Sequence, residues 1–262
     1  MDVGVGPPIF VCTPQKTGSS TMRVWAHELY SGLERHFSNV FSEEYYDDVR
    51  ELGLGFVANN DNEVPKVLRL AVGSSAAGLY VRQKVAIVRD PLERAVSAFY
   101  SKVACDADDV EDRERVMHGW RNCAKEHGLS TLADVVWTKG GEAKACLTPS
   151  EFVRVLRAVQ HLDIPAQFKH PELDCLDRHF HPWSDICRFD AWHYDRLVRS
   201  EEMEHFMNSA RDRLHLPGSI TTGVEHKSKE ITVGEVFSPE EQAFLKEFYA
   251  KDFANLLHAG AV

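Results

Sequence analysis

The chain lacks the features that mark a membrane-spanning or nucleic-acid-binding protein. None of its apolar runs approaches the roughly 20 residues that cross a bilayer, so we expect no membrane segment in this chain. Basic residues are in deficit, with 30 Lys and Arg against 40 Asp and Glu and a formal net charge of −10. This balance gives no overall attraction to nucleic acid or to an acidic membrane, so any anion-binding site must be local.

The six cysteines lack the spacing of a zinc site. No Cys-x-x-Cys pair occurs among them, and no cluster of acidic residues suggests a bound cation. Cys12 lies in an apolar run and is interpreted as a small buried residue. Cys175 and Cys187 flank a turn-rich stretch and are the best candidates for a disulfide bond, with free thiols as the alternative.

Internal repeats and low-complexity tracts are absent from the 262 residues, which suffice for one sizeable α/β domain or two small ones. Apolar runs predict buried strands at residues 9–12, 67–72, 85–89 and, more weakly, 194–199. The first, third and fourth precede segments of helical period, which indicates a central, mostly parallel sheet flanked by helices. We predict a single domain over 1–262, with about 103–147 as a helical and loop insertion.

Two further helices begin with capping boxes. Thr148 and Glu151 open one, and Ser238 and Glu241 open the other. In both, a proline follows the capping residue at the first helical position, where its missing N–H leaves no backbone hydrogen bond unmade. We therefore predict helices that start directly after Thr148 and Ser238.

The segment after the first predicted strand carries more hydrogen-bond donors than a turn needs. A helix that begins after a glycine-containing loop offers free backbone N–H groups and the positive end of its dipole to an anion. We predict a phosphate-binding loop formed by Lys16, Thr17, Gly18, Ser19, Ser20 and Thr21. The alternative is a plain turn with a surface lysine. The loop does not fit the Walker A pattern, because its lysine precedes the glycine and the first glycine is absent.

A second informative segment starts at Arg89, at the end of the strand predicted at 85–89. Pro91 suits the start of a helix, and Ser97 lies about two turns into that helix. An arginine and a serine hydroxyl on the same side make a two-donor clamp for a second phosphate. Alone, the two residues are better explained as a surface Arg–Asp pair and an ordinary helix serine, but the phosphate-binding loop predicted at Lys16 to Thr21 favours the clamp.

The two segments together resemble the sulfotransferases that use 3′-phosphoadenosine 5′-phosphosulfate (PAPS). Lys16-Thr-Gly-Ser-Ser-Thr21 resembles their 5′-phosphosulfate loop, and Arg89-Asp-Pro-x-x-Arg94-x-x-Ser97 is similar to their 3′-phosphate motif. The form RDPLERAVSAFYSK most resembles the membrane-anchored carbohydrate sulfotransferases of the chondroitin and HNK-1 type. The stretches 181–203 and 237–256 resemble later segments of that group, although Pro182 separates His181 from Trp183 here.

The resemblance implies a P-loop-like sulfotransferase fold and transfer of a sulfuryl group from PAPS to an acceptor hydroxyl, without a metal. Lys16 would stabilise the charge on the departing phosphate, and the loop from Thr17 to Thr21 would hold the 5′-phosphosulfate. Arg89 and Ser97 would hold the 3′-phosphate, which the product adenosine 3′,5′-bisphosphate keeps. By family analogy a late loop closes over the nucleotide, and the candidates in it are Lys227 and Ser228.

The general base that deprotonates the acceptor is left open by the sequence. Several sulfotransferases use a histidine between the two phosphate motifs, but none occurs from Phe37 to Asp90. Glu43 and Glu44 are loosely similar to the glutamate used by enzymes that act on glucosamine 3-hydroxyls, with a solvated acidic turn as the alternative. Three histidines are a further option: His170, His179 and His181.

The net charge favours a neutral or weakly acidic glycan as acceptor, or a small hydroxylated metabolite, over a heparan-like polyanion. Two other functions compete with sulfuryl transfer. A P-loop kinase would need the Walker lysine after the glycine and acidic residues for Mg²⁺, and a non-catalytic nucleotide- or glycan-binding module could dispense with Lys16. The expected compartment is the Golgi lumen if the chain is a trimmed ectodomain of a membrane-anchored enzyme, and the cytoplasm otherwise.

Overall fold

The computed structural model describes residues 9–14, 16–17, 83–107, 110–162, 175–187, 189–190, 193–213 and 231–259. The chain forms two compact units, each made of two stretches of sequence. Unit 1 comprises residues 1–89 and 187–225, and unit 2 comprises residues 90–186 and 226–262. The single domain expected over 1–262 stays a prediction.

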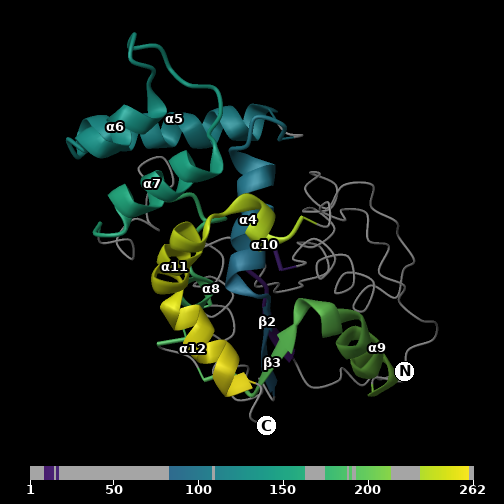
Figure 1. The fold of residues 1–262 in the computed structure, drawn as a ribbon. Coiled ribbons are helices and arrows are strands. Elements are labelled where there is room, and N and C mark those ends of the chain that lie inside the picture. Colours follow the sequence, from purple (N-terminus) through teal and green to yellow (C-terminus); the bar gives the residue numbers. More distant parts are fainter. Residues whose placement is uncertain are drawn as a thin grey trace, which may run out of the picture. The chain divides into compact units, whose positions relative to one another are not determined.

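Unit 1 is built on a parallel sheet. Its described strands are β1 (Ile9–Cys12), β2 (Gln83–Val88) and β3 (Arg196–Arg199), in the order β1-β2-β3. Cys12 pairs with Ala86 across β1 and β2, and Val88 pairs with Arg199 across β2 and β3. Figure 1 shows β2 and β3 side by side, with α9 (Met203–Arg213) following β3 after the 3-10 turn Ser200–Glu202.

These strands confirm the expected α/β class with a mostly parallel sheet. β2 carries an unbroken run of fully buried residues from Val85 to Val88, as is typical of parallel strands covered on both faces. The strand predicted at 85–89 is observed at 83–88, and the one predicted at 194–199 is shorter, at 196–199. The strand predicted at 67–72 lies outside the described residues.

Unit 2 is helical in its described part. Its helices are α4 (Pro91–Lys102), α5 (Val110–Glu126), α6 (Ser130–Val136), α7 (Pro149–Val159), α8 (Trp183–Ile186), α10 (Val233–Val236), α11 (Pro239–Phe248) and α12 (Ala250–Ala259). Helices α5 and α6 fall within 103–147, where helix and loop are expected. That this stretch is an insertion stays a prediction.

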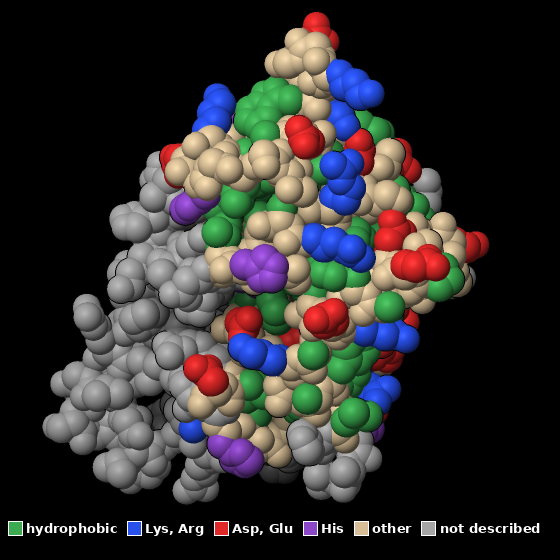
Figure 2. Space-filling model, turned by 60° about the vertical axis from the view of Figure 1, so that its left-hand side comes forward, with side chains coloured by type: hydrophobic (Ala, Val, Ile, Leu, Met, Phe, Trp, Pro, Cys, Tyr) green, Lys and Arg blue, Asp and Glu red, His purple; other side chains and the backbone are tan. Residues whose placement is uncertain are grey.

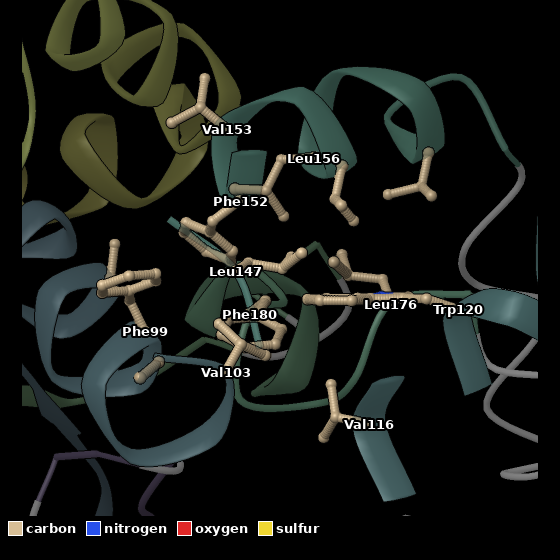
Figure 3. Packing of buried hydrophobic residues seen from close by; sticks show 14 of the residues in the cluster. Phe99, Val103, Val116, Trp120, Leu147, Phe152, Val153, Leu156, Leu176 and Phe180 are labelled. Atoms are coloured by element: carbon tan, nitrogen blue, oxygen red, sulfur yellow. The ribbon is translucent and has the colours of Figure 1, made fainter. Parts of the chain in front are cut away.

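Aromatic side chains fill the core of unit 2. Figure 3 shows Phe180 among Phe152, Trp120 and Val103, which come from three different helices or their ends. The ring centroids of Phe152 and Phe180 are 4.9 Å apart, and Trp120 stacks on Phe180 at 5.6 Å. All three aromatic side chains are almost fully buried, so this cluster fixes the segment around Phe180 against α5 and α7.

The capping residues explain where the main helices of unit 2 begin. The Asp90 carboxylate accepts hydrogen bonds from the backbone N–H groups of Leu92 and Glu93, at 2.9 and 3.1 Å, and so starts α4. Both predicted capping boxes are confirmed. Thr148 and Glu151 cap α7, and Ser238 and Glu241 cap α11, each with proline at the first position.

All six cysteines are paired, which corrects two of the sequence interpretations. The disulfides are Cys12–Cys187, Cys105–Cys146 and Cys123–Cys175. The predicted Cys175–Cys187 bond is wrong, because Cys175 packs in unit 2 and bonds to α5, whereas Cys187 belongs to unit 1 and bonds to the end of β1. Cys12 is buried as expected, but it is not a thiol.

None of the helices in the described part of the chain combines the length and the apolar composition that a membrane crossing requires.

Candidate functional site

The carboxyl edge of the sheet in unit 1 carries two of the predicted phosphate ligands. The segment from Thr13 to Thr17 follows β1, and Arg89 directly follows β2. Since β1 and β2 are parallel neighbours, Lys16 and Arg89 leave the sheet at the same edge, from strands about 4.8 Å apart. Ligands of open parallel sheets bind outside this edge.

Lys16 has an unusual backbone conformation. Its φ of 64° places it in the left-handed region, and it is the only non-glycine residue of the described chain with a positive φ. For a residue with a side chain this conformation costs about 1–2 kcal/mol. Strain of this kind persists where the surrounding structure enforces it, and it is concentrated at functional sites. The backbone therefore marks Lys16 as a residue held in place.

Thr17 closes the turn that holds Lys16. Its hydroxyl donates to the carbonyl oxygen of Pro14 at 2.5 Å, and its backbone N–H donates to the same oxygen at 3.3 Å. Both donors therefore point back into the loop, and Thr17 itself is fully buried. Its role as a phosphate ligand stays a prediction. The other predicted loop ligands lie outside the described residues: Gly18, Ser19, Ser20 and Thr21.

The two predicted ligands of the 3′-phosphate fall in different units. Arg89 is half-buried at the end of unit 1, and Ser97 is buried in the middle of α4 in unit 2. Between them, Asp90 occupies the first backbone donors of α4. The local structure at each residue thus agrees with the predicted strand, turn and helix. Lys227 and Ser228, the candidates in the late loop, lie outside the described residues.

The candidate base residues that the structure describes differ in their burial and in their hydrogen-bond partners. His181 is fully buried, and its Nε2 lies 2.6 Å from the carbonyl oxygen of Leu176. A ring buried in this way does not face an acceptor. His179 is partly exposed, and its Nδ1 lies 2.5 Å from the Asp177 carboxylate. Glu43, Glu44 and His170 lie outside the described residues.

Asp177 is held ionised beside His179. Burial favours the neutral carboxyl, but the hydrogen bonds and charge of His179, with the charge of Arg115, hold the pKa of Asp177 well below its usual range. The Arg115 guanidinium lies 3.2 Å from the second carboxylate oxygen. A carboxylate that fixes one ring nitrogen orients a histidine for proton transfer, so His179 stays an alternative to the glutamates.

One group of described residues brings possible metal-ligating atoms within 4.8 Å of one another: Cys123, His127 and Cys175. The sulfurs of Cys123 and Cys175 are joined in a disulfide. They therefore do not offer the two thiolates that a zinc ion would bind.

A buried polar cluster in unit 2 contains two residues for which the sequence gives no role. Arg94 of α4 and Asp252 of α12 are both almost fully buried. Burial raises the pKa of Asp252 to about 6, although hydrogen bonds from Ser184 and Trp183 and the charge of Arg94 oppose this. Nothing in the sequence links the two residues. Arg94 belongs to the 3′-phosphate motif, and Asp252 lies 158 positions later in the chain.

We expect Asp252 to make the free energy of unfolding depend on pH. Between its ordinary pKa and about 6, the folded protein keeps a proton that the unfolded chain releases. The free energy of unfolding should therefore fall as the pH rises from about 4 to about 6. Urea titrations of Asp252→Asn should show a flatter slope in this window, whereas Asp185→Asn, which removes the partly exposed carboxylate paired with Lys251, should keep it. Equal slopes in the parent and Asp252→Asn would contradict the assignment.

Comparison with known proteins gives one match. A family model described as "Sulfotransferase family" matches residues 8–256, nearly the whole chain. The matched range includes both phosphate segments, the disulfide-bonded cysteines and most of α12. No curated protein and no solved structure matches the chain significantly.

Proposed function

The chain belongs to the sulfotransferase family and is a sulfotransferase enzyme, and from that premise we propose that it transfers the sulfuryl group of PAPS to a hydroxyl of a carbohydrate. The observation that supports the donor is the arrangement of unit 1. A strained lysine and an arginine follow two neighbouring parallel strands at the edge where such sheets bind nucleotides. Lys16 would contact the 5′-phosphosulfate of PAPS, and Arg89 would contact its 3′-phosphate.

Sulfuryl transfer resembles phosphoryl transfer, in which positioning and charge stabilisation supply most of the catalysis. Bound PAPS would supply the sulfuryl group and a phosphate leaving group. Lys16 would stabilise the charge that develops on that phosphate, since its backbone is fixed by the turn from Pro14 to Thr17. Arg89 and Ser97 would hold the 3′-phosphate, which distinguishes PAPS from ATP.

A carbohydrate acceptor is supported by the resemblance of the 89–102 segment to carbohydrate sulfotransferases. The surface charge argues for a neutral or weakly acidic glycan. Figure 2 shows lysine and arginine side chains interspersed with aspartate and glutamate over the described part of one face. A long polyanion would prefer a continuous basic surface. A small hydroxylated metabolite is the second candidate for the acceptor, and the same net charge of −10 accommodates it.

Transfer of radiolabelled sulfate from PAPS tests the proposal. The purified chain is incubated with desulfated glycosaminoglycans, neutral oligosaccharides and small phenols or steroids, each in a separate reaction. Label in a glycan fraction would support the carbohydrate acceptor, and label only in the small molecules would replace it with the metabolite. Label in none of them, with PAPS left intact, would count against the acceptor classes proposed.

We expect the transferase activity to survive removal of divalent metals. Lys16 and the backbone donors of its loop would stabilise the charge that Mg²⁺ stabilises in kinases. Rates measured with an excess of EDTA should equal those without it. A complete loss of activity on chelation that Mg²⁺ restores would contradict a lysine-based mechanism.

An oxidising compartment, of which the Golgi lumen is the candidate, is proposed because three disulfides link all six cysteines. Disulfides persist in secretory compartments and are rare in the cytosol. Maleimide labelling of the protein isolated from its native cells, with thiols blocked at lysis, should find no reactive cysteine before reduction and six after it. Labelling of all six before reduction would place the protein in a reducing compartment.

A further inference from the structure

A segment of unit 2, residues 176–184, has five of its backbone polar groups paired with three buried side chains. These side chains come from parts of the chain far from it in sequence: Arg94 of α4, Tyr249 between α11 and α12, and Asp252 of α12. A buried backbone outside helices and strands needs such partners, because each unpaired group is costly. The three side chains therefore determine where this segment lies against the helices of unit 2.

Arg94 contributes the connection to α4. Its guanidinium donates to the carbonyl oxygen of His181 at 2.6 Å and to that of Arg178 at 3.5 Å. The residue is 1% exposed, so it does not present its charge to a nucleotide in solution. Burial lowers the pKa of this guanidinium, while Tyr249 and Asp252 oppose the shift. Arg94 thus joins helix α4 to the segment from inside the unit.

The carboxy-terminal helices supply the other two connections. The Tyr249 hydroxyl donates to the carbonyl oxygen of Phe180 at 2.9 Å. The Asp252 carboxylate accepts from the backbone N–H groups of Trp183 and Ser184, both at 2.9 Å. Tyr249 thus holds the segment between Arg94's two attachment points and Asp252 holds it just after them, so the segment that binds α4 is also held by the carboxy-terminal helices.

We propose that Arg94 is a positioning residue for the 3′-phosphate subsite, which it serves by fixing the turn of α4 that carries Ser97. The proposal rests on the proposed function, in which Ser97 binds that phosphate. Arg94 precedes Ser97 by one helical turn, so the two side chains lie on neighbouring positions of one helix face. A shift of α4 at Arg94 is transmitted to Ser97 because the helix moves as a rigid body, and displacements near 1 Å weaken a positioned contact strongly.

A double-mutant cycle tests this link. Calorimetry measures adenosine 3′,5′-bisphosphate and AMP binding to the parent, Arg94→Met, Ser97→Ala and the double variant. Arg94→Met should lower the bisphosphate-to-AMP affinity ratio at least about tenfold when Ser97 is present, and by much less when Ser97 is alanine, because coupled residues are not additive. Arg94→Lys, which can still donate to His181, should recover part of the ratio.

A matched control separates positioning from general damage to unit 2. Arg113 of α5 also donates to backbone carbonyl oxygens, those of Ala104 and Cys105, at 3.3 and 3.1 Å. Arg113→Met should keep the parental affinity ratio. Thermal unfolding of every variant is measured alongside, and if Arg94→Met does not fold, the cycle is repeated with Arg94→Lys, where a loss of about threefold is expected.

Three results would overturn the proposal. A folded Arg94→Met protein with the parental ratio would remove the positioning role alone. An equal loss of the ratio with and without Ser97 would show that Arg94 acts by another route. A parent that binds the bisphosphate and AMP equally would defeat the 3′-phosphate clamp, and with it the proposed donor on which the positioning role depends.

Discussion

Replacing Lys16 by methionine is expected to lower the rate constant of sulfuryl transfer by about a hundredfold or more, the scale seen when one preorganised donor is removed. Methionine keeps most of the apolar stem and removes the charge. If Lys16 acts on the charge that develops as the phosphate departs, its contribution belongs mainly to the transition state. Affinity for adenosine 3′,5′-bisphosphate should therefore fall much less than the rate. Single-turnover kinetics and calorimetry of the product measure the two quantities separately.

The control for Lys16 comes from the opposite edge of the same sheet. Lys84 pairs with Phe10 near the amino ends of β2 and β1, whereas Lys16 follows the carboxyl end of β1. Lys84→Met should leave the transfer rate close to that of the parent. If Lys16→Met folds normally and turns over at the parental rate, Lys16 is a surface lysine in a turn and the catalytic role is wrong. Its left-handed backbone would then have only a structural explanation.

Replacing Arg89 by alanine is expected to cost about 2–5 kcal/mol of affinity for adenosine 3′,5′-bisphosphate, if the contact between the guanidinium and the phosphate is desolvated. Affinity for AMP should change little, because AMP has no 3′-phosphate. Comparing the two losses of affinity distinguishes a contact with the 3′-phosphate from a general effect on the end of β2. Calorimetry of both ligands with the parent and the variant gives all four affinities.

An exposed arginine of unit 2 provides the control for Arg89. Arg154 lies on the outer side of α7, so Arg154→Ala removes the same charge from the protein without touching the sheet. Its nucleotide affinities should equal those of the parent. A loss of AMP affinity as large as the loss of bisphosphate affinity in Arg89→Ala would contradict a specific 3′-phosphate contact. The residue would then support the sheet edge and not the ligand.

Local signals in the sequence predict much of this fold. The capping boxes at Thr148 and Ser238 specify helix starts because the groups that satisfy the first N–H groups lie within three residues of each other. The apolar run that forms β2 predicts a buried strand for a similar reason, since burial on both faces selects unbroken apolar residues. Such signals do not depend on how distant segments meet.

The sequence does not predict which distant segments of the chain pair with one another. Cys175 and Cys187 are close in the chain, yet each bonds to a cysteine at least 52 positions away. A disulfide requires two Cβ atoms to face each other, and proximity in sequence does not provide this. The Arg94–Asp252 cluster is hidden for the same reason, because only the folded chain brings α4, α12 and the 176–184 segment together. The left-handed conformation of Lys16 also has no sequence signal, since glycine is the residue that usually marks it.

The pairing of the cysteines determines whether a chain cut once by a protease stays one covalent molecule. Cys12–Cys187 spans 175 positions, and the other two disulfides lie inside that span. A chain nicked once anywhere between Cys12 and Cys187 remains one covalent molecule and separates into two pieces only after reduction. No cysteine follows Cys187, so a nick between Cys187 and Tyr249 cuts the only covalent link to the peptide that carries Tyr249 and Asp252. Hydrogen bonds and packing alone would retain that peptide on the 176–184 segment.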